Sequence, residues 1–312
     1  MTRESSKIAG EAAIMDGLRG DLARDDRALA SVVPVLSHAL AHPGEPLVSD
    51  EVIANMRGFF AGIAREFPTS VDSGSADAFA AVLVENGDLV SHYYAAGIES
   101  AITHSLSEDY GIDPALPALV QELIGSKDAQ IAELAMAFMA AQARFSAGHR
   151  RGTAALFELP PELFDAAVST WSAWAESIGF TDASGAEAEL RARYDEGVTR
   201  LGLINRLLNA IGAGSQVFSE IETAGLAIFA SAIAKDSSQP RELVLLSCQA
   251  QQSLRLALSL KASGRSSEAI LRQFAFVGRG IALPPDFDEW SQQQAAEILN
   301  ASPLSAKAAG HA

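Results

Sequence analysis

Histidine and tyrosine side chains are concentrated in one segment that could bind a ligand. His92, Tyr93 and Tyr94 are consecutive, and His104 follows twelve residues after His92. The segment is otherwise apolar, and buried tyrosine and histidine side chains need hydrogen-bond partners. Because such clusters sometimes border a cavity, we consider His92, Tyr93, Tyr94 and His104 candidate residues of a pocket wall. The alternative is that they are core or groove residues with ordinary hydrogen-bond partners.

A second pair of histidines, His38 and His42, has the i, i+4 spacing that places two imidazoles on one helix face. Such a pair could bind a metal ion or a haem. A third ligand is not indicated, and the chain has neither the Glu-x-x-His motif of di-iron bundles nor the His-Glu-x-x-His motif of zinc proteases. His42 precedes Pro43, which predicts a helix C-terminus there. We therefore expect no metal site and no cofactor.

Acidic pairs and glycine-rich turns give only weak signals for catalysis. The pairs are Asp25-Asp26, Glu108-Asp109 and Asp195-Glu196. Adjacent residues on a helix point about 100° apart, so we expect these carboxylates on solvated faces. The glycines at 212–214 and 278–280 do not continue as a phosphate-binding motif. The sequence therefore identifies no catalytic residue.

The composition indicates a soluble globular chain. It has 312 residues, 48% of them hydrophobic, and a formal net charge of −16. Nucleic-acid binding depends on Lys and Arg that neutralise phosphates, so this charge makes it unlikely. Cys248, the only cysteine, lies in an apolar run and is expected to be a buried structural thiol. The charged N-terminus and the lack of a long apolar segment predict a cytoplasmic protein with no membrane segment.

One stretch of this acidic chain is basic, and we call it the basic stripe. Its basic residues are Arg241, Arg255, Lys261, Arg265, Arg272 and Arg279. These cations could simply stabilise the C-terminal ends of helices. Alternatively, they could form a docking face for an acidic protein partner or for the acidic half of a second copy. The segment His149-Arg150-Arg151 would extend that face if the fold brought it near.

The spacing of apolar residues predicts helices along the whole chain. In residues 131–138, for example, apolar side chains recur at i, i+3, i+4 and i+7. Three Ser-x-x-Glu segments, beginning at Ser105, Ser184 and Ser219, have the spacing of a capping box and predict helix starts. We therefore expect an all-α fold with about a dozen helices. It would be a multi-helical bundle or an irregular α-solenoid with HEAT-like helix pairs.

Charge and proline content suggest a division along the chain. We expect an acidic helical region at 1–150, a connecting segment with two prolines at 151–180, a helical region with the basic stripe at 181–300, and a flexible tail at 301–312. Residues 159–165 and 283–288 both place Pro-Pro before an acidic residue and a tryptophan-containing segment. This similarity fits either two related modules or chance.

These observations leave two functional hypotheses in different classes. The first is a cytoplasmic helical interaction or regulatory scaffold, without catalytic activity, that binds a protein partner or self-associates through the basic stripe. The alternative is a helical protein or enzyme that binds a small molecule in a cavity near His92, Tyr93 and Tyr94. Stacked helices and the missing catalytic motif favour the first, whereas the aromatic and histidine cluster favours the second.

Overall fold

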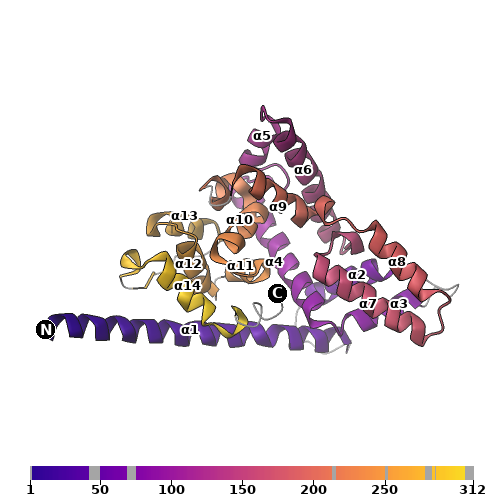
Figure 1. Ribbon diagram of the computed structural model, residues 1–312, viewed down its shortest axis with the longest axis horizontal. Coiled ribbons are helices and arrows are strands. Elements are labelled where there is room, and N and C mark those ends of the chain that lie inside the picture. The colour runs from indigo at the N-terminus through magenta and orange to yellow at the C-terminus, as the bar shows by residue number, and fades with distance from the viewer. Residues whose placement is uncertain are drawn as a thin grey trace. The chain divides into compact units, whose positions relative to one another are not determined.

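The computed structural model is helical throughout the residues that it describes, which are 2–41, 50–68, 75–212, 216–249, 252–277, 283–284 and 286–305. This part of the chain forms fourteen α-helices and several short 3-10 helices, and it contains no strand; Figure 1 shows their order between the two ends of the chain. The predicted all-α, multi-helical architecture is confirmed.

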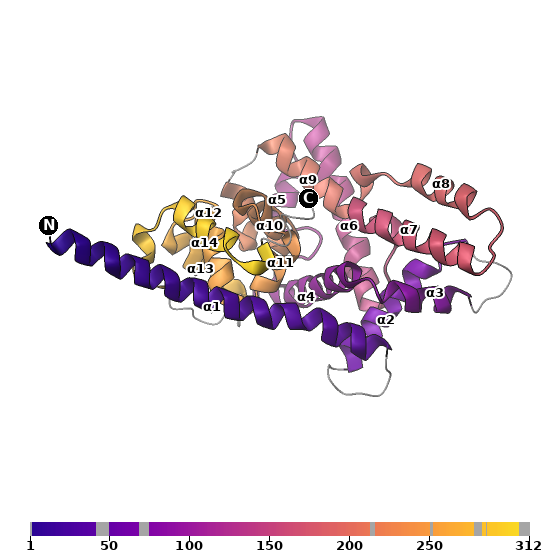
Figure 2. The same ribbon diagram turned by 60° about the horizontal axis from the view of Figure 1, so that its bottom comes forward.

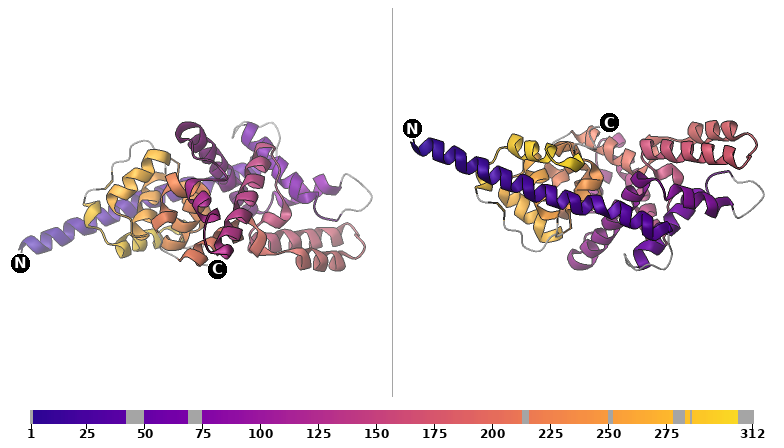
Figure 3. Two further views of the ribbon diagram at one scale, coloured as in Figure 1. Left: turned by 90° about the horizontal axis from the view of Figure 1, so that it is seen from above. Right: turned by 90° about the horizontal axis from the view of Figure 1, so that it is seen from below.

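Contacts between residues group the chain into two compact units. Unit 1 comprises residues 1–32, 213–222 and 226–312, and unit 2 comprises residues 33–212 and 223–225. The first helix, α1 (Thr2–Ala41), contributes to unit 1 up to Val32 and to unit 2 from Val33, and Figure 3 shows it as one continuous helix. Each unit therefore combines segments that are distant in the sequence, unlike the continuous segments that charge and proline content suggested.

Unit 2 contains eight α-helices after α1 within its described residues. They are α2 (Asp50–Ala64), α3 (Ser75–Leu83), α4 (Gly87–Tyr110), α5 (Ala118–Ile124), α6 (Ala129–Arg150), α7 (Pro161–Ser177), α8 (Ala183–Arg193) and α9 (Arg200–Ile211). Helix α6 packs against α4, α5 and α9, and α2 packs against α3 and α4. Figure 2 shows α7 and α8 side by side, in agreement with their contacts.

Capping residues explain where the two longest helices of unit 2 begin and end. The Asn86 side chain accepts bonds from the amides of Asp88 and Leu89 at 3.0 and 3.1 Å, so α4 starts at Gly87. This helix ends at Gly111, whose φ of 70° favours glycine. Asp128 caps α6 in the same way as Asn86 caps α4. Ser105 lies inside α4, so the helix start predicted there is wrong.

Aromatic rings fill the core of unit 2. The indole of Trp171 on α7 is fully buried and stacks on Phe67, with ring centroids 5.6 Å apart. Phe67 in turn packs edge-on against Phe79 of α3 at 5.0 Å. Large buried rings contribute most of the apolar burial in a core of this kind. They fix α3 against α7 and hold the end of α2 in place.

Unit 1 is completed by five further helices. They are α10 (Ile221–Ser237), interrupted at Gly225, α11 (Arg241–Ser247), α12 (Ser253–Ala262), α13 (Ser267–Val277) and α14 (Gln292–Asn300). Helix α12 packs against α11, α13 and α14, and Figure 1 shows this group together in orange to yellow. Leu256, Leu258 and Leu260 of α12 are fully buried, which places this helix at the centre of the unit.

Candidate ligand-binding site

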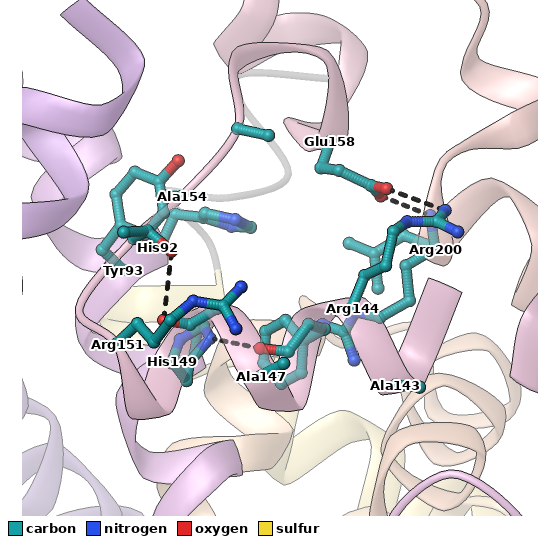
Figure 4. Close-up of a pocket in the computed structure, with 16 residues that line it drawn as sticks. His92, Tyr93, Ala143, Arg144, Ala147, His149, Arg151, Ala154, Glu158 and Arg200 are labelled. Carbon is teal, nitrogen blue, oxygen red and sulfur yellow. Dashed lines mark hydrogen bonds and ion pairs between the residues drawn. The ribbon is translucent and has the colours of Figure 1, made fainter. Parts of the chain in front are cut away.

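Unit 2 contains a cavity of about 560 Å³. Its walls come from the N-terminal half of α4, the C-terminal half of α6, the segment of residues 151–158 and the first two residues of α9. Figure 4 shows how the side chains of these four segments converge on one space. Small-molecule sites in proteins typically have volumes of about 300 to 1,000 Å³, so the cavity is large enough for an organic ligand.

Two of the four residues expected in a pocket wall border this cavity. His92 and Tyr93 line it from α4. Tyr94 is half-buried on the same helix but does not line the cavity. His104 lies further along α4, with its side chain 71% exposed and its Nε2 3.3 Å from Glu108. Of the four residues, His92 and Tyr93 therefore line the cavity, Tyr94 is half-buried elsewhere on α4, and His104 lies at the surface.

Tyr93 is held by aromatic rings from α2. Its ring centroid lies 5.3 Å from that of Phe59 and 5.7 Å from that of Phe60. Burial raises the pKa of the Tyr93 hydroxyl above its ordinary value of 10.0, and the carboxylate of Glu66 adds to this effect. The Tyr93 side chain therefore stays neutral and can offer a hydroxyl group, but no charge, to a ligand.

His149, near the end of α6, is a cavity residue that the sequence did not single out for this role. Its ring lies between Phe145 and Phe59, with centroid distances of 4.1 and 4.7 Å. Burial, with a further effect from the Arg200 cation, lowers the pKa of His149 from 6.5 to about 4. The imidazole is therefore neutral at physiological pH.

The two ring nitrogens of His149 have different surroundings. Nδ1 lies 3.3 Å from the Phe145 carbonyl oxygen. A neutral ring that donates from Nδ1 to this carbonyl carries its lone pair on Nε2. Nε2 is buried and has no hydrogen-bond partner among the described residues. The cavity wall therefore contains a buried hydrogen-bond acceptor that its neighbours leave unused.

A buried ion pair positions the start of α9 at the cavity. The Arg200 guanidinium donates to both carboxylate oxygens of Glu99, at 2.5 and 3.0 Å. Both side chains are almost fully buried. Gln142 adds a bond at 3.0 Å, and the Arg200 guanidinium lies 3.7 Å above the Phe145 ring. A bidentate pair of this geometry is among the strong interactions of protein interiors. It joins α4, α6 and α9.

Glu158 fixes the cavity segment to α9. One of its carboxylate oxygens accepts the backbone N–H of Arg200 at 2.9 Å, at the N-terminus of α9. The other lies 3.3 Å from the guanidinium of Arg144 on α6. A carboxylate at a helix N-terminus is favoured by the helix dipole. Glu158 therefore links three of the four segments that form the wall.

Glycines on α2 allow the segment of residues 152–154 to lie close to that helix. A Cβ atom at Gly58 would collide with the carbonyl oxygen of Gly152. A Cβ atom at Gly62 would lie 2.7 Å from the carbonyl oxygen of Ala154. The i, i+4 spacing of the two glycines puts both on one helix face. This face holds the cavity segment, and the i, i+4 spacing of the glycines is the sequence signal that indicates it.

The basic stripe is not an exposed face in the residues that the structure describes. Arg255 is fully buried and pairs with Asp26, which is itself 2% exposed. Arg265 is buried and lies 3.5 Å from Asp236. Lys261 is buried and bonds the Asp288 carbonyl oxygen at 3.3 Å. These three cations are themselves buried and paired, so they do not form the exposed docking face that the sequence suggested.

The other members of the stripe do not restore such a face. Arg241 is half-buried and donates to the Ser231 hydroxyl at 2.8 Å. Arg272 is about half-exposed, but it lies within 3.1 and 3.6 Å of Glu268 and Glu220. Arg279 lies outside the described residues. The segment 149–151, which we considered an extension of the stripe, belongs to unit 2, whereas the stripe belongs to unit 1.

The Arg255 cluster also corrects two smaller expectations. Asp26 was expected on a solvated face, but the Arg255 guanidinium binds its carboxylate in the core of unit 1. Ser302 and Ser305 were expected in a flexible tail, but both are buried and accept bonds from Arg255 at 2.8 and 3.2 Å. Gln239 completes the cluster at 3.2 Å. Both errors arise because the partners are far apart in the sequence.

Cys248 and the histidine pair complete the candidates from the sequence. Cys248 is buried in unit 1, and burial raises the pKa of its thiol to about 12, as expected for a structural residue. His38 lies in α1, whereas His42 lies outside the described residues. Within the part of the chain that the structure describes, no group of three His, Cys, Asp or Glu side chains is placed to hold a metal ion.

Comparisons with family models, curated proteins and solved structures gave no match to this chain. Among the described helices, none is long and apolar enough to cross a lipid bilayer. The candidate site therefore has to be interpreted from its own geometry and chemistry.

Proposed function

We propose that this protein binds a small organic molecule in the cavity of unit 2. The observation that carries the proposal is the cavity itself, about 560 Å³ in volume, with convergent polar groups in a wall that is otherwise built from alanine, phenylalanine and leucine side chains. Ligand sites commonly combine an apolar surface with a few fixed polar groups. The polar groups here come from His92, Tyr93, His149, Thr153, Glu158 and three arginines.

The wall is preorganised for binding. Arg200 and Glu158 are held by buried or helix-terminal bonds, and the 152–154 segment is seated on the glycines of α2. Groups that are ordered before binding reduce the entropy that a ligand must overcome. We propose binding and assign no reaction.

The scaffold hypothesis loses its specific support from the basic stripe. That hypothesis required exposed cations, and Arg255, Lys261 and Arg265 are buried. The cavity hypothesis required a space next to His92 and Tyr93, and both residues border one. The balance of observations therefore favours a small-molecule site over a basic docking face.

An uncharged fluorescent probe tests the proposal. N-phenyl-1-naphthylamine, whose emission rises in apolar surroundings, should bind saturably to the parent protein. Ala147→Phe places a ring in the cavity wall and should weaken probe binding at least about tenfold, because it fills space that the probe needs. Ala140→Phe is the matched control, since Ala140 is exposed on the same helix and does not line the cavity.

The comparison of the two variants decides the result. Circular dichroism and thermal melting establish that both variants fold like the parent. Weaker probe binding in Ala147→Phe alone supports the cavity as the site. Absence of saturable binding in the parent, or equal binding by parent and Ala147→Phe, would contradict the proposal.

A further inference from the structure

We infer that the ligand of this cavity is an organic anion with a single negative charge, a carboxylate attached to an apolar or aromatic body. The inference rests on the proposed function and adds the chemical class of the ligand. It follows from the balance of charges around the cavity, from the position of Arg151, and from the neutral state of His149 and Tyr93.

Charged groups at the cavity leave one excess cation. Three arginines line it, namely Arg144, Arg151 and Arg200, together with one carboxylate, that of Glu158. Arg200 is neutralised by Glu99 behind the wall, and Arg144 lies 3.3 Å from Glu158. Among the described residues, no carboxylate forms an ion pair with Arg151. An excess positive charge at this point is notable in a chain whose formal net charge is −16.

Arg151 is placed to meet a ligand at the cavity. It follows the last turn of α6, and its side chain is exposed. Figure 4 shows its guanidinium directed into the space between His92 and His149. The backbone amide of Arg151 already donates to the Gly148 carbonyl oxygen at 3.0 Å, so the part of Arg151 that a ligand can reach is its guanidinium. A guanidinium in this position can bind a carboxylate through two parallel hydrogen bonds.

Two other polar groups of the wall, His149 and Tyr93, add no charge for a ligand to match. His149 is neutral at physiological pH, since its pKa is lowered to about 4. Tyr93 is neutral because burial raises the pKa of its hydroxyl. The rest of the wall offers the ring of Phe145, the side chain of Leu201 and several alanine methyl groups. A ligand with one anionic end and an apolar body satisfies both parts of the cavity.

Highly charged anions fit this arrangement poorly. A nucleotide or other polyphosphate needs several unpaired donors or cations, or a glycine-rich loop at a helix start. The amide of Arg200 at the N-terminus of α9 is already bonded to Glu158. The guanidinium of Arg200 is already bonded to Glu99 and Gln142. One unpaired arginine therefore matches one carboxylate better than a phosphate chain.

A matched pair of competitors tests the ligand class. 2-Naphthylacetate and its primary amide have the same skeleton and differ in charge, and each is titrated against protein loaded with N-phenyl-1-naphthylamine. The carboxylate should displace the probe at about tenfold lower concentration than the amide, since a charge-assisted hydrogen bond at a partly exposed site contributes roughly that ratio. The preference should weaken as salt is raised.

Two neighbouring arginines provide the matched variants. Arg151→Gln should reduce the affinity for the carboxylate about tenfold more than it reduces the affinity for the amide or the probe, because only the carboxylate loses a charge contact. Arg150→Gln should leave all three unchanged, since Arg150 is exposed and does not line the cavity. Equal displacement by carboxylate and amide, or a carboxylate preference that survives Arg151→Gln, would overturn the inference.

The two proposals fail in different ways. If the probe binds and Ala147→Phe blocks it, but the carboxylate has no advantage over the amide, the cavity remains a ligand site and the inferred ligand class is wrong. If the probe does not bind to the parent protein, the proposed function fails and the inference fails with it.

Discussion

His149→Phe should remove a loss of stability that the parent protein shows when the pH falls from 7 to 5. In the folded protein the pKa of His149 is lowered to about 4, whereas its ordinary value is 6.5. Between these two values the unfolded chain binds a proton that the folded protein does not. Protonation therefore favours unfolding as the pH falls through 6.5, and the loss is complete below about pH 4.

The magnitude follows from the difference between the two pKa values. At about 1.4 kcal/mol for each pKa unit, the full effect corresponds to ~3 kcal/mol, of which about 2 kcal/mol has been lost by pH 5. Phenylalanine suits the position because the ring lies between Phe59 and Phe145. The substitution removes the proton-binding site, so the variant should lack this component at every pH.

Urea unfolding at pH 7 and pH 5 measures the effect. Trp171 and Trp174 lie in unit 2 and Trp290 in unit 1, so a Trp290→Phe background makes tryptophan emission report on unit 2. The parent should lose about 2 kcal/mol more than His149→Phe between the two pH values. The pH 7 comparison serves as the control, because it measures the change in packing alone.

An equal pH dependence for parent and variant would refute this reasoning. NMR provides an independent check through the His149 Cε1–H resonance. Its chemical shift should stay nearly constant from pH 8 to pH 5.5 in the folded protein, and it should change with a midpoint near the ordinary value of 6.5 in urea.

Three further predictions concern packing and reactivity. Gly58→Ala should destabilise unit 2 by about 1 to 3 kcal/mol and weaken probe binding, because its methyl group collides with the Gly152 carbonyl; unchanged urea midpoint and probe affinity would contradict this. Asp26→Ala should cost unit 1 about 3 to 5 kcal/mol by leaving the buried Arg255 unpaired, and a loss below 1 kcal/mol in urea unfolding would count against it. Cys248 should react with iodoacetamide at pH 8 only after urea unfolds unit 1, since burial raises the pKa of its thiol to about 12; rapid labelling of the folded protein would be the contrary result.

Local sequence patterns predicted the fold class and part of the cavity wall. Helical spacing in segments such as 131–138 predicted an all-α fold, because the positions of the apolar residues within one helix indicate which face of that helix is buried. The histidine and tyrosine cluster on α4 led to His92 and Tyr93, which border the cavity. It could not separate them from Tyr94, because the direction of a side chain depends on which helices pack around α4.

Partners that are distant in the sequence account for what the sequence did not predict. Arg200 and Glu99 are 101 positions apart, and Asp26 and Arg255 are 229 apart. Neither pair leaves a recognisable pattern in the local sequence. The basic stripe therefore looked like an exposed surface, although Arg255 lies in the core of unit 1. The role of His149 likewise depends on Phe59 of α2, which only the fold brings to it.

The most direct test of the cavity as a ligand site is NMR of protein labelled with ¹³C in the alanine methyl groups, titrated with N-phenyl-1-naphthylamine. Ala96, Ala147 and Ala154 line the cavity from three different segments, whereas the exposed Ala140 does not. We predict saturable shifts at the first three methyl groups and none at Ala140. Saturable binding of the probe that leaves Ala96, Ala147 and Ala154 unchanged would contradict the account.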